Sequence, residues 1–390
     1  MTTSVGSVFS AVLDPVNRHD PYPLYTSLRR TPISREADGT YVVSTFREIS
    51  ALLEDPRVSS AYSPEEGADP HQIVGLPPSF LRQDPPGHDR MRRLAMRPFG
   101  PPHTPHRVAD LQPTLQKIAA GLVRDFPVST VDLVDQFAYP LPVSVICALL
   151  GVPLEDEPRF RDWIDAALNA VTPNVGALGD LAQYLGDLVD RRTADPGDDM
   201  LSAMATDDGP EGRMTRAELV ATAILLLIAG HETTVNLIAN SALVLLRQPL
   251  WLERLLADPS LVVPLVEEVL RYDPPVQMLP WRTALADIPI AGTTIPKGSS
   301  ITLVLAAANR DPEHFKDPDR FDPDRRIAQH LAFGDGIHYC YGAPLARLEA
   351  QMALQAIAPV LARARLLEDP PVYRLSAVLR GPRHLRVALD

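Results

Sequence analysis

The feature of the sequence that most constrains the fold is a very apolar run over residues 215–247. Thr215 and Glu218 form a capping-box pattern at its start, and the run predicts one helix roughly 45 Å long at 1.5 Å per residue. A polar knot, His231 to Thr234, interrupts it near the centre. A membrane span would place these polar groups in lipid at a high cost. We therefore interpret the run as a helix buried inside a large protein core. A buried acid at its centre, Glu232, needs a functional explanation.

Composition agrees with a protein that has such a core. The 390 residues are 45% hydrophobic and 22% charged, which is ordinary for a globular protein. Two cysteines exclude a disulfide framework and a four-cysteine zinc site, and they fit a reducing cytoplasm. The net charge of −12 argues against a nucleic-acid surface. Residues 1–30 lack a cationic segment followed by an apolar one, so we expect no signal peptide and no membrane anchor.

The order of patterns along the chain predicts a mainly α fold with a small β-rich sector, built as a single domain over residues 1–390. Helical patterns dominate after Pro85, and Thr45 with Glu48 predicts an earlier capped helix that Pro56 ends. Residues 57–80 show no clear period and predict a long, functional loop. Strand-like segments 33–36 and 41–43, with the turn signal Asp38-Gly39 between them, predict a hairpin. Further strand-like segments are 276–279, 287–294, 300–304 and, weakly, 372–389.

The segment from Phe333 to Arg347 carries the most informative chemistry. Glycines on both sides of Cys340 permit tight turns and close approach of a flat ligand. Cys340 directly precedes a predicted helix, whose unpaired N–H groups favour a thiolate. A thiolate held in a rigid loop is a good iron ligand. By contrast, Cys147 lies in an apolar helical pattern and is expected to be an inert core residue.

The pattern Phe-Gly-x-Gly-x-His-x-Cys-x-Gly-x-x-Leu-Ala-Arg at this segment resembles the haem-binding loop of the cytochrome P450 family, and every fixed position is matched. The resemblance extends over nearly the whole chain. It implies the cytochrome P450 fold, a triangular helical prism with haem b between the long central helix and the cysteine loop with the last helix. It also implies Cys340 as the axial iron ligand, with cofactor contacts from Phe333, Gly334, His338 and Gly342.

Three further motifs match the same family. Glu268 and Arg271 are similar to its Glu-x-x-Arg, and Pro318-Asp319-Arg320-Phe321 resembles the motif whose arginine completes a structural triad, here Arg320. Ala229-Gly230-His231-Glu232-Thr233 resembles the oxygen-activation motif. In that motif Gly230 thins the helix above iron, and Glu232 with Thr233 relays protons to dioxygen. His231 is expected to be a bystander.

Cations are needed to hold the two haem propionates. His88 and Arg92 lie four residues apart and therefore on one face of a predicted helix. Arg282 matches the family's strand arginine, and the resemblance makes His338 a further donor. Arginine suits such a site because its fork pairs with carboxylates in a bidentate manner.

The family's substrate regions map by position onto 62–80, 168–178, 226–233, 276–279 and 377–378. These regions are mostly apolar and predict a hydrophobic, medium-sized substrate. The expected wall residues are Leu226, Val276, Met278 and Val378, with Asn169, Asn174 and Gln277 as polar anchors. The stretch 225–240 resembles family members that tailor macrolides and other polyketides in actinobacteria, which suggests antibiotic biosynthesis.

The chain contains no nucleotide-binding glycine motif, flavin segment or iron–sulfur cysteine set, so the resemblance implies an external ferredoxin and ferredoxin reductase. Arg93, Arg97 and Arg347 are the expected basic docking patch. The main hypothesis is a cytoplasmic, monomeric monooxygenase that uses O2 to hydroxylate or epoxidise a hydrophobic small molecule, without nucleic acid or membrane. The alternatives are a haem-thiolate enzyme that performs oxidative coupling or dealkylation, and a haem sensor without turnover.

Overall fold

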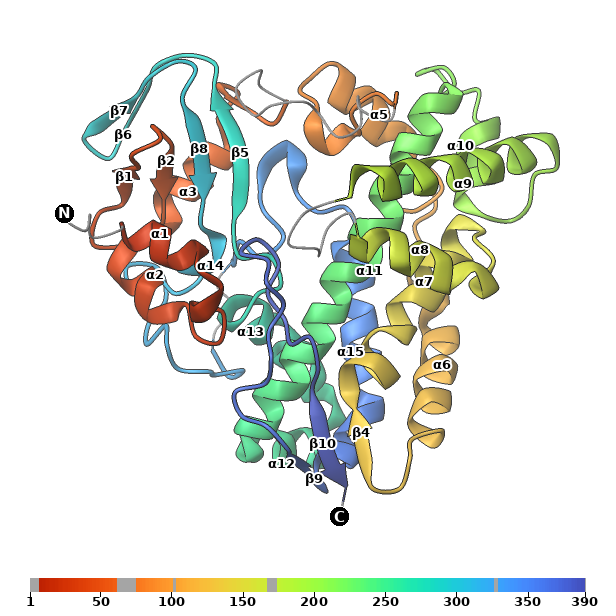
Figure 1. The fold of residues 1–390 in the computed structure, drawn as a ribbon, viewed down its shortest axis with the longest axis vertical. Helices are drawn as coiled ribbons and strands as arrows, with labels where there is room; N and C mark the ends of the chain where they lie inside the picture. The colour runs from red at the N-terminus through yellow and green to blue at the C-terminus, as the bar shows by residue number, and fades with distance from the viewer. Residues whose placement is uncertain (1–6, 62–74, 101–102, 167–173, 326–328, 390) are drawn as a thin grey trace.

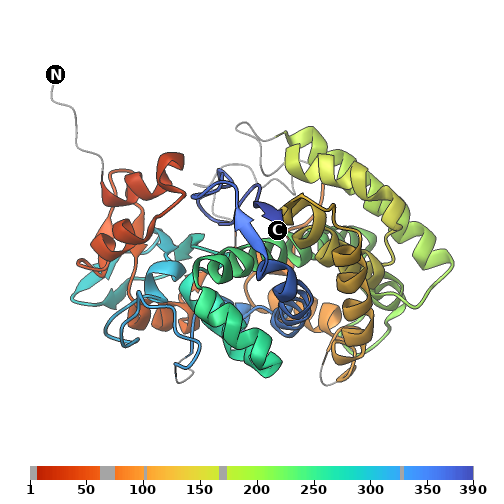
Figure 2. The same cartoon turned by 90° about the horizontal axis from the view of Figure 1, so that it is seen from below.

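The computed structural model describes residues 7–61, 75–100, 103–166, 174–325 and 329–389. A β-rich sector with the first helices occupies one side, and helices α7 to α10 occupy the other (Figure 1). The view from below shows the same division, with α11 and α15 between the two sides (Figure 2). The main helices are α1 Val8–Leu13, α2 Tyr22–Leu28, α3 Phe46–Glu54, α5 Gly87–Met96, α6 Gln112–Arg124, α7 Pro140–Leu150, α8 Glu157–Ile164, α9 Val175–Ala194, α10 Met200–Thr206, α11 Arg216–Arg247, α12 Pro249–Ala257, α13 Val262–Tyr272, α14 Leu305–Ala308 and α15 Ala343–Leu361.

Helix α11 is the predicted central helix, and it has 32 residues. Its capping box is formed: Thr215 Oγ1 accepts from the N–H of Glu218, and the Glu218 carboxylate accepts from the N–H of Thr215. The helix is long and apolar enough to cross a membrane, but 72% of its most apolar window is buried within the described protein. It packs against α7, α9, α13 and α15. This confirms the interpretation of residues 215–247 as a core helix.

The β-rich sector is built on a five-stranded sheet in the order β1-β2-β8-β5-β3. The predicted hairpin forms antiparallel β1 and β2, and β2 pairs in parallel with β8. The segment expected as a strand from 276 begins only at Leu279, since Val276 makes an isolated bridge to Leu379. The strands are β1 Ile33–Arg35, β2 Tyr41–Val43, β3 Val58–Ser59, β4 Thr130–Asp132, β5 Leu279–Ala284, β6 Ile288–Ile290, β7 Thr293–Ile295, β8 Ser300–Leu303, β9 Ala364–Leu366 and β10 Arg386–Leu389.

Helix α3 begins where Thr45 predicts, but a different residue caps it. Thr45 makes no side-chain bond to the helix backbone, and its hydroxyl instead donates to Glu48. The N–H of Phe46 is bound by the Asp311 carboxylate at 2.9 Å. The capping group therefore comes from a segment 265 residues away in the chain, which joins the start of the sheet sector to its end.

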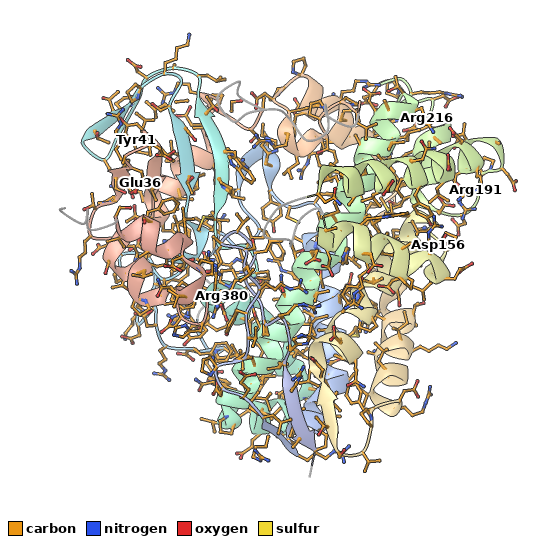
Figure 3. The ribbon with its side chains drawn as sticks, viewed as in Figure 1. Glu36, Tyr41, Asp156, Arg191, Arg216 and Arg380 are labelled. Atoms are coloured by element: carbon orange, nitrogen blue, oxygen red, sulfur yellow. The ribbon has the colours of Figure 1, made fainter. Side chains whose placement is uncertain are left out.

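The segment from 370 to 389 connects distant parts of the molecule. Strand β10 lies between β4 and β9 in a three-stranded sheet. Arg380, labelled near the centre of Figure 3, is 5% exposed and donates to Asp273 at 2.8 Å. Asn240 of α11 donates to the backbone of both Asp273 and Arg380. This segment therefore binds the central helix to the end of α13.

Candidate active site

A largely apolar cavity of about 340 Å³ lies between α11, the segment 332–346 and strand β5. It brings together twelve of the residues that the sequence singles out, from five separate parts of the chain. These are Arg92, Leu226, Ala229, Gly230, Thr233, Val276, Arg282, Phe333, Gly334, His338, Cys340 and Gly342. A larger and more polar hollow of about 550 Å³ near Tyr22 and Arg380 contains none of them.

Cys340 is held by the backbone of its own loop. Its N–H donates to Phe333 O at 2.9 Å, and α15 begins three residues later at Ala343. Burial raises the pKa of the Cys340 thiol, while the N–H groups of Gly342 and Ala343 and the guanidinium of Arg92 act in the opposite direction. A bound metal cation would also lower the pKa of the Cys340 thiol, because a metal-coordinating thiol is deprotonated. Cys147 is buried in α7, and its burial raises its pKa to about 12.

The cysteine loop is fixed against α3 by one glycine. Gly336 has φ +65°, and a Cβ on it would lie 2.3 Å from the backbone oxygen of Leu53. The left-handed backbone favours glycine, and the carbonyl of Leu53 cannot move without the helix. This close contact fixes the position of the cysteine loop, residues 333–342, relative to α3.

Replacing Gly336 with alanine is expected to lower the free energy of unfolding by more than about 2 kcal/mol, since a left-handed alanine alone costs roughly 1–2 kcal/mol. Urea unfolding measures the loss. Gly298 has φ +84° and open space around its Cβ position, so Gly298→Ala carries the backbone cost without the clash. Equal losses in the two variants would contradict the role of the Leu53 contact.

Behind the loop, Glu268 and Arg271 of α13 form a buried bidentate ion pair with distances of 2.7 and 2.8 Å. The expected third member, Arg320, is wrong: its side chain is 69% exposed, and only its backbone oxygen contacts Arg271. Arg325 takes the place instead, with its Nε 3.5 Å from Glu268 and its side chain 14% exposed. The reason is the path of the chain, because the N–H of Asp322 binds Glu268 at 2.8 Å and turns the following residues inward.

The motif on α11 divides between the cavity and the protein interior. Thr233 lines the cavity, and its hydroxyl donates to Ala229 O at 2.9 Å. Glu232 is 4% exposed and is not part of the cavity wall. Its carboxylate lies 3.6 Å from Arg374 and 3.8 Å from His231. Burial lowers the pKa of His231, so this residue is a neutral neighbour of the acid at neutral pH.

Gly230 borders the cavity and also packs against another helix. A Cβ on it would lie 2.8 Å from Ile146 Cδ1 of α7. Glycine therefore allows α7 and α11 to pack closely, and Ile146 forms part of the cavity wall at this contact. The sequence reasoning missed Ile146 and Leu149 as wall residues, because α7 is apolar on most sides and no periodicity marks the cavity face.

The four predicted cations gather beside the cysteine loop. The rings of His88 and His338 are 4.4 Å apart, and Arg92 donates to the backbone of Tyr339 at 2.6 Å. Burial, His88 and Arg282 lower the pKa of His338 to about 3. The Nε2 atom of His88 is buried and has no hydrogen-bond partner among the described residues.

This arrangement fits haem. An orphaned buried ring nitrogen and a crowd of cationic groups are suited to carboxylates such as the two propionates. The apolar wall on one side and Cys340 on the other suit a flat apolar ring with an iron atom at its centre. The donor set of the cavity therefore agrees with the predicted cofactor.

Glu349 is a buried acid that the sequence reasoning did not select. It lines the cavity, is 1% exposed, and has one carboxyl oxygen without a hydrogen bond. Burial raises its pKa well above the usual value. Glu349 is an acidic residue on the otherwise apolar inner face of α15. That isolated acid in an apolar pattern is the sequence signal that could have identified it.

Glu349→Gln is expected to stabilise the protein near pH 7.5 by at least about 1.4 kcal/mol, the equivalent of one pKa unit. The folded-state pKa of Glu349 is raised, so its favourable contribution exists at low pH and is lost as the pH rises above about 4.3. The difference between variant and wild type should therefore vanish near pH 4. Urea unfolding at both pH values tests this, with exposed Glu253→Gln as the control. A difference that does not depend on pH would contradict the expectation.

Two of the four expected substrate residues are wrong. Leu226 and Val276 line the cavity, whereas Met278 is packed in a separate core cluster with Phe9 and Tyr25, and Val378 packs against that cluster. Gln277 bonds to Tyr25 and Met278 packs in the same cluster, so neither residue lines the cavity.

The three expected polar anchors are also accounted for. Gln277 accepts from the Tyr25 hydroxyl at 2.9 Å. Asn174 is exposed and caps α9, and Asn169 lies outside the described residues. These placements leave the substrate side of the described cavity apolar.

The expected basic docking patch is largely neutralised. Arg97 pairs with Asp207 at 2.6 Å, and Arg347 pairs with Glu267 at 2.6 Å, where its charge helps to lower the pKa of Glu267 to about 2. Arg93 is 59% exposed and lies 3.2 Å from Glu211. Each of these arginines therefore already has a carboxylate partner.

Comparison with known proteins identifies the family. Residues 256–358 match the cytochrome P450 family. The chain is 42% identical to cytochrome P450 monooxygenase PikC of Streptomyces venezuelae, covering 87% of this chain and 83% of that one. It is 37% identical to 6-deoxyerythronolide B hydroxylase of Saccharopolyspora erythraea, covering 95% of this chain and 96% of that one. Among solved structures, cytochrome P450 PksS of the Bacillus subtilis bacillaene polyketide synthase matches with a TM-score of 0.89 at 30% identity, covering 97% and 99%.

Each of these matches covers most of this chain and most of the relative, and the fold of the solved structure agrees with the observed architecture. The cysteine loop, the central helix and the cation cluster lie where a haem bound by a cysteine thiolate would require them. The chain therefore belongs to the cytochrome P450 family of haem-thiolate monooxygenases.

Proposed function

We propose that Cys340 is the axial thiolate of the haem and that the enzyme inserts one oxygen atom of O2 into an uncharged, hydrophobic small molecule. The observation that carries this proposal is the cavity lined by Cys340, Thr233 and three of the four predicted cofactor-binding side chains, Arg92, Arg282 and His338. When bound, haem supplies the binding and reductive activation of O2. The other parts of the chemistry fall to side chains of this chain.

The cation cluster would fix the position of the cofactor. His88, Arg92, Arg282 and His338 lie together beside the cysteine loop, and guanidinium groups and imidazole N–H groups donate hydrogen bonds to carboxylates. Above the cofactor, the Thr233 hydroxyl donates to Ala229 O and can turn to hold a proton at the reacting oxygen. Glu232, directly behind it, would resupply that proton from the side of Arg374.

The apolar wall supports the substrate class. Most of the described wall above the cysteine loop is apolar, and it includes Ile146, Leu149, Leu225, Leu226, Val276 and Leu279. A ligand with a charge on this side would lose its hydration without gaining a partner. Relatives that hydroxylate a polyketide lactone or belong to a polyketide synthase support a role in tailoring secondary metabolites, including antibiotics.

The remaining parts of the proposal concern the setting of the enzyme. We infer that it is a single-domain, monomeric cytoplasmic protein that receives electrons from NAD(P)H through a separate ferredoxin reductase and ferredoxin. The burial of α11 within the described protein argues against its use as a membrane span. Because Arg97 and Arg347 are paired, docking would depend on shape as well as charge.

A substrate screen tests the proposal. Purified ferric holoprotein is titrated with a panel of uncharged polyketide lactones, sterols and fatty acids, and conversion to the high-spin form is recorded. Compounds that bind are then incubated with a surrogate ferredoxin, its reductase, NAD(P)H and O2. A product heavier by one oxygen supports the proposal. Binding without any oxidised product across the panel would favour a haem sensor.

Thr233→Ala is expected to lower the amount of product per NAD(P)H consumed by about tenfold or more, because proton transfer by a positioned group contributes roughly 10²–10⁴-fold. NAD(P)H consumption should continue, and hydrogen peroxide should replace the product. Ser241 provides the matched control, since its hydroxyl also bonds within α11 but far along the helix from the cavity. Unchanged product yield in Thr233→Ala would remove the hydroxyl from the mechanism.

A further inference from the structure

Trp281 has an unusual backbone conformation for a large aromatic residue. Its φ is +60°, in the left-handed region that bulky residues rarely adopt. The side chain is 55% exposed, so burial of the ring does not account for the conformation. Strain of this kind persists where the surroundings hold it and is often found at functional sites.

The strained residue lies at a bulge in strand β5. Leu279 pairs with Leu303 of β8, and Arg282 pairs with Ile301. An advance of three residues along β5 therefore lies opposite an advance of only two residues along β8. In a regular strand, residues three apart point to opposite faces of the sheet. The extra residue brings both Leu279 and Arg282 to the cavity face, and both line the cavity.

A second arginine holds the bulge in place. Arg82, from the turn Phe80–Arg82, donates NH1 to the carbonyl oxygen of Trp281 at 2.9 Å, and its guanidinium lies 5.9 Å from the ring centre. Arg82 is 8% exposed. Arg282 also approaches this carbonyl, at 3.5 Å. The backbone oxygen of Trp281 therefore contacts both Arg282 and Arg82, and Arg82 directly follows the wall residues Phe80 and Leu81.

We propose that Trp281 and Arg82 are positioning residues for Arg282. The left-handed backbone of Trp281 turns the Arg282 guanidinium toward the haem carboxylates, and Arg82 keeps that backbone in place. The proposal rests on the proposed role of Arg282 in holding haem. The property that matters at residue 281 is its backbone conformation, and the indole ring is dispensable for it.

The rate of haem transfer from ferric holoprotein to excess apomyoglobin tests the proposal. Trp281→Gly keeps the left-handed backbone without a ring, whereas the β-branched side chain of Trp281→Val disfavours it. We expect Trp281→Gly to release haem within about twofold of wild type. Trp281→Val and Arg82→Met should release it about tenfold faster, the equivalent of about 1.4 kcal/mol. Arg282→Met should be at least as fast as these two.

Each of the other possible results contradicts one specific part of the proposal. Wild-type release by Arg282→Met contradicts the proposed role of Arg282 itself. Faster release by Arg282→Met with wild-type release by Trp281→Val and Arg82→Met contradicts the positioning role alone. Release by Trp281→Gly as fast as by Trp281→Val shows that the ring is what counts. If Trp281→Val does not fold, as judged by circular dichroism, Arg82→Met and Trp281→Gly decide between these outcomes.

Discussion

Replacing Cys340 with alanine is expected to abolish monooxygenase turnover, with a loss of at least about a thousandfold, or about 4 kcal/mol of barrier. In the proposed function the Cys340 thiolate would donate electron density to iron, and oxygen activation depends on such donation. The reduced, carbon-monoxide-bound variant should also lose the red-shifted Soret band of a thiolate ligand. Absorption spectroscopy and product formation are the two measurements.

Cys147→Ala is the matched control for this prediction. Cys147 is the other cysteine, and it is buried in α7 away from the described cavity wall. Its removal should leave the thiolate spectrum intact and cost no more than the small cavity it creates. A thiolate-type spectrum that survives Cys340→Ala, or disappears in Cys147→Ala, would contradict the assignment of the ligand.

Glu268→Ala is expected to destabilise the fold by about 3–5 kcal/mol, because it leaves the Arg271 charge buried without its partner. Arg271 is 2% exposed, and its other bonds go only to the backbone oxygens of Asn309, Pro318 and Arg320. These segments precede the cysteine loop, so we also expect poor haem incorporation. Urea unfolding and the ratio of haem to protein measure the two effects.

Arg325 and Arg320 provide an internal comparison for this buried cluster. Arg325→Ala should cost about 1–3 kcal/mol, since it removes a charged donor from Glu268 and from nearby carbonyl groups. The exposed Arg320→Ala should change stability by less than about 0.5 kcal/mol. The opposite ranking would restore Arg320 as the third member of the cluster.

The confusion between these two arginines shows where sequence reasoning reaches its limit. The triplet Pro-Asp-Arg occurs twice, ending at Arg320 and at Arg325. Only the first is followed by the phenylalanine of the family motif, but only the second is turned inward by the bond between Asp322 and Glu268. That choice depends on the position of α13, about 55 residues earlier, and no local pattern records it.

Features with local causes were predicted well. The capping box at Thr215, the hairpin at Asp38-Gly39 and the glycine-framed Cys340 loop each depend on a few neighbouring residues. Errors arose where a distant segment decides the outcome. Asp311 replaces Thr45 as the cap of α3, and Arg325 replaces Arg320 beside Glu268.

The contact between Arg374 and Glu232 links the acid of the active site to a segment that is synthesised long after α11. Arg380 makes a similar late contact with Asp273, 107 residues earlier. On the ribosome, a nascent chain with α13 complete would still have Glu232 without Arg374 and Asp273 without Arg380. Pairs so distant in sequence form late in folding, since the loop between them must close first. Extensions or fusions placed after residue 390 should therefore be judged by their effect on the surroundings of Glu232 as well as on expression.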